Sequence, residues 1–200
     1  MRSWLSVILG VFLSATLISV ALYYRKSRHL PPSATEVPTQ TSTSKTEQSP
    51  DLTLDEKGLS KTTVSLNTSQ GVIKFKFYPK EAPKTVARII ELIQKGFYQG
   101  LSFHRVIPGF VIQGGDPTGT GSGGSGQKLE PEFNSHQHIE GTVSMARSSD
   151  IHSADSQFYI SLGIHPHLDR NYTVFGQVIE GIEIAKKIKQ GDKILSTSLE

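Results

Sequence analysis

Alternation of apolar and polar residues marks the start of a folded region near residue 62. Residues 72–78 read VIKFKFY, and the run 62–68 precedes them across the tripeptide SQG. A period of two places successive side chains on opposite faces of a β-strand. The two runs therefore predict an antiparallel hairpin.

Helical spacing follows directly after the hairpin. Residues 83–96 begin with a proline, end with a glycine and carry apolar side chains at Val86, Ile89, Ile90 and Ile93. Proline suits the first turn of a helix, and glycine suits the left-handed residue that ends one. This segment predicts one amphipathic helix, and residues 182–190 predict a second.

Further short apolar runs, bounded mostly by Gly, Pro, Asp or Asn, predict strands at 103–106, 110–113, 142–146, 157–162, 173–179 and 193–199. With the hairpin they make eight strands. Many short strands with only two helices indicate a mainly β fold, since closing a sheet removes its exposed edges. We expect a closed eight-stranded antiparallel β-barrel capped by two α-helices.

The N-terminal segment has a different pattern. Residues 4–24 contain no charged residue, and 21 helical residues can cross a hydrocarbon core of roughly 30 Å. We expect residues 1–29 to hold a transmembrane anchor. A cleavable signal sequence is the alternative, because Ser19 and Ala21 are small residues that suit a cleavage site.

The sidedness of this anchor is less clearly indicated. Arg25, Lys26 and Arg28 follow the apolar run, whereas only Arg2 precedes it, which favours a cytoplasmic C-terminal domain. The signal-like N-terminus and the composition of the next segment favour a periplasmic or extracytoplasmic domain, which is our expectation. Secretion after cleavage is a further alternative.

Residues 30–60 are dominated by Ser, Thr, Pro, Glu and Gln. Such a segment has too little apolar surface to offset the entropy lost on ordering. It predicts a flexible linker, and the domain organisation is then an anchor (1–29), a linker (30–60) and a folded domain (61–200).

Composition excludes several classes of site. The 200 residues include no cysteine, and 21 Lys and Arg stand against 18 Asp and Glu without a basic cluster. Thiolate chemistry and nucleic-acid binding are therefore not expected. The histidine pairs supply too few ligands for a metal site. A serine hydrolase is not expected, because no G-x-S-x-G elbow is present. The stretch GTGSGG at 119–124 lacks the strand and helix that a dinucleotide-binding fingerprint needs. We interpret that glycine-rich stretch as a mobile surface loop.

The most informative stretch is FHRVIPGFVIQGGD at 103–116, two strand-like pieces joined at a Pro-Gly turn. Together with GTVSMA at 141–146, SQFYI at 156–160 and VFG at 174–176 it resembles the cyclophilins. The resemblance covers residues 62–200. It implies an eight-stranded barrel with two helices and isomerisation of the peptide bond preceding proline, without any cofactor or metal.

The resemblance also implies site residues. Arg105 matches the catalytic arginine. The walls of the proline pocket are matched by Phe110, Met145, Phe158 and Leu168, and the groups that contact the substrate backbone by Gln113, Ala146 and Gln157. The sequence departs from the commonest family pattern at further substrate-binding positions, namely Val111, Arg147, Tyr159, His167 and Tyr172.

His167 is the departure with the clearest consequence. Cyclosporin-sensitive members carry a tryptophan at this position, whose indole donates to the drug. The resemblance therefore implies weak cyclosporin binding with activity retained.

We thus expect a monomeric, membrane-held peptidyl-prolyl cis-trans isomerase that acts on proline-containing polypeptides and assists folding. The alternative is a non-catalytic module in a membrane assembly that binds exposed proline peptides. Arg105, Gln113 and Phe158 together favour the enzyme, because a binding module would not need the arginine.

Overall fold

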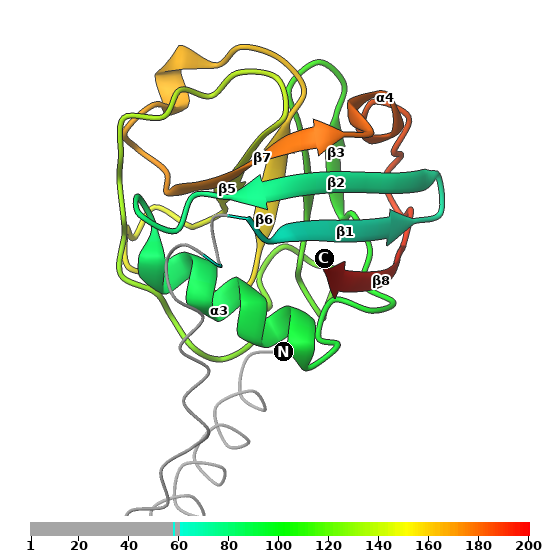
Figure 1. Ribbon diagram of the computed structural model, residues 1–200, viewed down its shortest axis with the longest axis horizontal. Coiled ribbons are helices and arrows are strands. Elements are labelled where there is room, and N and C mark those ends of the chain that lie inside the picture. The colour runs from blue at the N-terminus through cyan, green and yellow to red at the C-terminus, as the bar shows by residue number, and fades with distance from the viewer. Residues whose placement is uncertain (1–57, 59–60) are drawn as a thin grey trace, which may run out of the picture. The chain divides into compact units, whose positions relative to one another are not determined.

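The computed structural model describes residue 58 and residues 61–200 (Figure 1). The expected anchor and, apart from Gly58, the expected linker lie outside the described residues. Within the described part of the chain, no helix combines the length and the apolarity needed to span a membrane.

Eight strands were expected, and the described residues form eight. They are β1 (Thr63–Thr68), β2 (Gly71–Phe77), β3 (Arg105–Ile107), β4 (Val111–Gly114), β5 (Thr142–Met145), β6 (Phe158–Ser161), β7 (Val174–Glu180) and β8 (Ile194–Leu199). All their pairings are antiparallel, in the order β3-β4-β6-β5-β7-β2-β1-β8. The mainly β fold class is thus confirmed.

The expected closure of the barrel is wrong, because the sheet is an open half-barrel whose edge strands β3 and β8 do not pair with each other. The segments that precede them exchange only a few bonds, including the backbone N–H of Phe103 to the carbonyl of Asp192 at 2.9 Å. Gly100 and Gly191 have φ of 80° and 95°, a left-handed conformation that turns each segment aside before a longer ladder can form.

Two helices flank the sheet. Helix α3 (Pro83–Gln94) ends close to its expected limit and packs against β8, whereas α4 (Ile182–Ala185) packs against β2 and is only four residues long. Figure 1 shows them on opposite sides of the β1–β2 hairpin. The expected second helix over 182–190 is therefore too long: after Ala185 the chain continues in turns, with the N–H of Ile188 bonded to the carbonyl of Ala185 rather than four residues back.

The apolar residues divide into two clusters. The larger fills the inside of the curved sheet and contains Ile112, Phe158 and Ile160, each less than 5 % exposed. The smaller lies apart from it and consists of the buried residues Val111, Ala146, Tyr159 and Leu168 with Phe110 and Tyr172 packed against them. A second apolar cluster outside the main core is a feature that a purely structural role for β4 and β6 would not require.

Candidate active site

The register of three strands aligns polar residues on the outer face of the sheet. Arg105 of β3 lies opposite Gln113 of β4, and Gln113 lies opposite Tyr159 of β6. Directly paired residues project from the same face of a sheet. The pleat therefore carries these three side chains outward together.

Arg105 is exposed and points along this face. Its Nη1 donates to Oε1 of Gln113 at 3.2 Å, and its guanidinium carbon lies 5.7 Å from the centre of the Phe110 ring. A guanidinium in such a place keeps its charge at all working pH values and has donors to spare. Arg105 can therefore bind a group presented above Gln113.

Gln113 is itself held by a chain of amide hydrogen bonds. Its Nε2 donates to Oε1 of Gln157 at 2.9 Å, and Nε2 of Gln157 donates to the carbonyls of Gly121 at 3.0 Å and Gly123 at 2.8 Å. Because Gln157 gives its donors to two fixed carbonyls, its oxygen must face Gln113. That in turn presents the oxygen of Gln113 to Arg105.

A cavity of about 130 Å³ opens beside Arg105, lined by Phe110, Val111, Gln113, Ala146, Arg147, Tyr159, Leu168 and Tyr172 together with Arg105 itself. Its apolar walls are the residues of the smaller cluster. It offers an apolar floor for a small ring, with the amide of Gln113 and the two charged side chains Arg105 and Arg147 around it.

Two predicted wall residues do not line this cavity. Met145 and Phe158 are 2 % and 4 % exposed and belong to the main core. They pair with each other across β5 and β6, and adjacent residues of a strand face opposite sides. Phe158 therefore points inward where its neighbour Tyr159 points to the cavity, and the prediction of Met145 and Phe158 as pocket walls is corrected.

His167 lies at the edge of the site. It is exposed in the 3₁₀-helix Pro166–Leu168, and its ring stacks on Phe110 with centroids 5.9 Å apart and an interplanar angle of 17°. The residue after it, Leu168, is buried in the cavity wall. The short helix thus supplies one exposed and one buried contact to the same corner of the site.

Arg147 separates this cavity from a larger one. Its guanidinium carbon lies 4.7 Å from the centre of the Tyr172 ring, and its Nη2 donates to the carbonyl of Asn171 at 2.8 Å. Gln113 and Ala146 also border both cavities. The two hollows therefore form one continuous site divided by Arg147.

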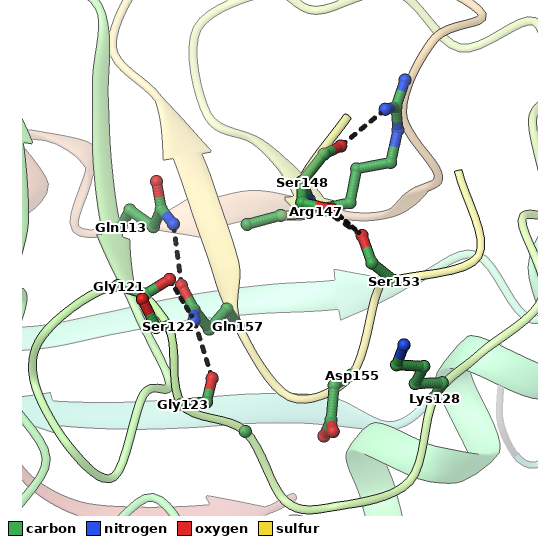
Figure 2. A pocket seen from close by; sticks show the side chains of 12 residues that line it. Gln113, Gly121, Ser122, Gly123, Lys128, Arg147, Ser148, Ser153, Asp155 and Gln157 are labelled. Carbon is green, nitrogen blue, oxygen red and sulfur yellow. Dashed lines mark hydrogen bonds between the residues drawn. The ribbon is translucent and has the colours of Figure 1, made fainter. Parts of the chain in front are cut away.

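The larger cavity has a volume of about 430 Å³ and is lined mainly by polar residues and glycines. Figure 2 shows Gln113, Gln157 and the glycine loop on one side, and Arg147, Ser148 and Ser153 on the other. Several of its residues were not foreseen, namely Gly121, Ser122, Gly123, Gly124, Lys128, Ser148, Ser153 and Asp155. They come from loops, where hydrophobic periodicity gives no signal.

The glycine-rich stretch is exposed at residues 119–122, as expected for a surface loop, and it is also hydrogen-bonded to the site. Asp116 is 1 % exposed and accepts from the N–H groups of Thr118 at 2.7 Å and Gly121 at 2.6 Å. Burial alone would raise the pKa of Asp116, but these hydrogen bonds and that of the Thr118 hydroxyl hold it at about 2. The loop is thus tied to the end of β4 at one point and to Gln157 at another.

Burial also sets the protonation of nearby rings. It raises the pKa of the Tyr159 hydroxyl and lowers the pKa of His104, the neighbour of Arg105. Both groups are therefore neutral near pH 7, and the arginines carry the charge at the smaller cavity. The site suits a neutral or electron-rich ligand with a small apolar ring.

The family model described as cyclophilin-type peptidyl-prolyl cis-trans isomerase matches residues 63–198. The chain belongs to this family. Isomerisation of peptide bonds preceding proline is the activity of a cyclophilin, and this chain is such an isomerase.

Curated relatives are similar to about two thirds of this cyclophilin. The peptidyl-prolyl cis-trans isomerase of Synechococcus elongatus is 46% identical over 136 residues, which is 67% of this chain and 93% of the relative. Peptidyl-prolyl cis-trans isomerase B of Bacillus subtilis is 48% identical over 130 residues, 64% of this chain and 90% of the relative.

Solved structures agree with the fold. A cyclophilin-type isomerase of Cryptosporidium parvum superposes with a TM-score of 0.66 at 30% sequence identity, covering 70% of this chain and 97% of the other. The crystal structure of the same protein in the presence of the dipeptide Ala-Pro gives a TM-score of 0.64 at 31% identity, covering 69% and 98%.

Proposed function

We propose that this cyclophilin accelerates X-Pro isomerisation in folding proteins at the smaller cavity, with Arg105 as the catalytic residue. The observation that carries the proposal is the position of Arg105, which stands at the rim of an apolar hollow of ring size and is aligned by Gln113. The relative solved with Ala-Pro supports a proline-containing polypeptide as the ligand.

The barrier to this reaction is electronic. Amide resonance gives the C–N bond partial double-bond character and a rotation barrier of about 18 to 20 kcal/mol. As the bond twists, the prolyl nitrogen loses conjugation and gains a usable lone pair. Rotation transfers no group and no electron, so the proposed reaction needs neither a nucleophile nor a cofactor.

Arg105 acts by binding the twisted state. A guanidinium N–H donated to the pyramidal prolyl nitrogen is stronger than one donated to the planar amide, and only such a difference lowers the barrier. The hydrogen bond from Arg105 to Gln113 holds the guanidinium group in one orientation. An ammonium group on a flexible stem would lack this orientation.

The rest of the cavity holds the substrate. The proline ring packs in the hollow between Phe110, Val111 and Leu168, closed by Tyr159 and Tyr172. Gln113 and the backbone beside Ala146 contact the neighbouring peptide groups. One side of the rotating bond is thereby fixed while the other turns.

A non-catalytic proline-binding module is the second candidate, because the same hollow could bind a proline loop without isomerising its X-Pro bond. Exchange NMR spectroscopy on the full chain with an Ala-Pro peptide separates the two. The enzyme exchanges the cis and trans resonances of the peptide at substoichiometric concentration. Peptide binding without a faster cis-trans exchange rate would show that the domain is a non-catalytic binding module.

The membrane attachment, oligomeric state and compartment of the enzyme are proposed from the sequence alone. Residues 4–24 anchor the chain to a membrane, residues 30–60 act as a flexible tether, and the catalytic domain is a monomer in a periplasmic or other extracytoplasmic space. The uncharged 21-residue run supports the anchor. Mass measurement of the mature N-terminus tests cleavage, protease access in intact cells tests sidedness, and light scattering of the detergent-solubilised chain tests the monomer.

A further inference from the structure

A buried histidine lies behind the wall of the proline cavity. His138 is 1 % exposed, and its Nε2 lies 2.9 Å from the hydroxyl of Tyr159 and 3.1 Å from that of Ser144. On the other side of the ring, Nδ1 lies 2.9 Å from Oδ1 of Asp169. We call Ser144, His138, Tyr159 and Asp169 the His138 network.

The hydrogen bonds fix the tautomer of the imidazole. Oδ1 of Asp169 already accepts the backbone N–H of His138 at 2.7 Å, and an ionised carboxylate can only accept. Nδ1 must therefore carry the proton that it donates to Asp169. In the neutral ring, which burial favours by lowering the pKa of His138, Nε2 is then an acceptor for the Tyr159 hydroxyl.

The network joins two walls of the cavity. Tyr159 comes from β6, whereas Asp169 directly follows Leu168 and ends the 3₁₀-helix Pro166–Leu168. His138 therefore links the aromatic wall to the aliphatic wall through a single side chain. A second link runs parallel, since the backbone N–H of His165 donates to the carbonyl of His138 at 2.7 Å.

Ser144, His138 and Asp169 have the composition of a hydrolase triad, but they cannot act as one. Ser144 is 0% exposed and lies on β5 directly opposite Tyr159 of β6. A nucleophile must reach its substrate, and this hydroxyl has no path to one. The network has to act through the residue that it holds at the cavity, and that residue is Tyr159.

We propose that His138 is a positioning residue, which holds the Tyr159 ring and the Leu168 wall at the spacing that grips the proline ring. The inference rests on the proposed function of this cavity. It assigns His138 no contact with the substrate and no proton transfer.

The role has a kinetic signature. An apolar wall binds the proline ring equally in the planar and the twisted state, so its loss raises KM and leaves kcat unchanged. If the histidine only supports folding, its loss lowers the apparent kcat and leaves KM unchanged, because a smaller fraction of the protein is folded. The two roles are thus distinguishable in one experiment.

The test compares the full chain with His138→Ala, Tyr159→Phe and the double variant, using exchange NMR spectroscopy at several peptide concentrations. Loss of one hydrogen bond to a neutral group corresponds to about fivefold in an equilibrium constant. We expect each single variant to raise KM about fivefold with kcat within about twofold of the parent. In the double variant, His138→Ala should raise KM by a smaller factor than it does in the parent, because the Tyr159 hydroxyl is already gone and the bond to Asp169 is still lost.

Rescue and control variants sharpen the result. His138→Gln can still donate to Asp169 and accept from Tyr159, so its KM should lie between those of the parent and His138→Ala. His152→Ala breaks a comparable histidine–carboxylate pair, with Glu130 at 2.7 Å, that lies on the surface, and should leave KM unchanged. Tyr159→Phe removes one atom only and keeps the test valid if His138→Ala fails to fold.

Two outcomes overturn the inference. One is a KM for Tyr159→Phe equal to that of the parent, and the other is full multiplication of the two single effects in the double variant. Neither outcome touches the role of Arg105, which is tested by kcat rather than by KM.

Discussion

Arg105 and Gln113 face each other across the β3–β4 pair and are joined by a 3.2 Å hydrogen bond from Nη1 to Oε1. Two further amide bonds carry this restraint through Gln157 to the carbonyls of the glycine loop. Arg105 is therefore positioned by a chain of four segments, of which the one that carries Gln157 is distant in sequence from the other three. Its orientation depends on Gln157 and the glycine loop as well as on Gln113, which it contacts directly.

Gln113→Leu should break this chain while keeping the volume of the side chain. Arg105 then loses its acceptor, and the amide oxygen of Gln157 loses its donor. We expect kcat to fall about tenfold, since a misplaced catalytic group loses much of its effect. The measurement is exchange NMR spectroscopy at saturating Ala-Pro peptide.

Gln177→Leu is the matched control. That amide is on β7 and donates to the carbonyl of Glu140 at 2.9 Å, away from Arg105. It should keep the parental kcat. Equal losses in the two variants would show that any lost strand glutamine slows the enzyme.

Cyclosporin should bind this domain weakly. His167 occupies the position where sensitive cyclophilins have tryptophan, and it stacks on Phe110 without an indole N–H. We expect His167→Trp to tighten inhibition at least tenfold, because one donor bond and added aromatic area are gained. An inhibition titration decides this, and nanomolar inhibition of the parent would contradict the prediction.

Stability should fall as the pH drops below neutrality. Burial lowers the folded-state pKa of both His104 and His138 from the ordinary value of 6.5. The unfolded chain therefore binds more protons than the folded chain as the pH falls below about 6.5, and this favours unfolding. Their contribution is complete above that pH and is lost towards the lower folded pKa values.

Urea unfolding at about pH 7.5 and about pH 5.5 measures this loss, in the range where histidine titrates. A double variant with His104→Gln and His138→Gln should show a smaller difference between the two pH values. An identical difference in parent and variant would place the pH dependence elsewhere.

Glycine at position 181 should be needed for stability. Gly181 has φ of 82°, and an added Cβ would contact the Val72 carbonyl and lie 3.0 Å from Cα of Ile73. Gly191 has φ of 95° with nothing within 4 Å of such a Cβ. We expect Gly191→Ala to cost about 1 kcal/mol from the left-handed backbone alone, and Gly181→Ala about 3 kcal/mol from strain plus the clash.

Chemical denaturation of the two variants tests this difference. Equal losses of unfolding free energy would mean that β2 moves aside to accept the methyl group.

Short-range patterns were enough to predict the secondary structure. Alternation predicted the β1–β2 hairpin, and short apolar runs bounded by turn residues predicted the other six strands. Helical spacing predicted α3 within two residues of its end. Barrel closure could not be read in this way, because it depends on how Gly100 and Gly191 turn two loops that are distant in sequence. The length of α4 could not be predicted either, because apolar residues at 184 and 188 suit a series of turns as well as a helix.

The site was predictable only in part. The motif around Arg105 predicted that Arg105 and Gln113 belong to the site. The resemblance alone could not tell that Tyr159 faces the cavity and Phe158 the core, because adjacent residues of a strand point to opposite faces. His138 carried no signal in the sequence, because its partners Tyr159 and Asp169 follow at least 21 residues later. Such contacts exist only once the sheet has folded.

The central claim is that Arg105 binds the twisted peptide bond more tightly than the planar one. Its most direct test is kcat of the full chain carrying Arg105→Ala, measured by exchange NMR spectroscopy at saturating Ala-Pro peptide beside a thermal unfolding curve. By analogy with an oxyanion donor, we expect kcat to fall about 10² to 10³-fold with KM nearly unchanged and the fold intact. A folded Arg105→Ala variant that isomerises the peptide as fast as the parent would contradict the account.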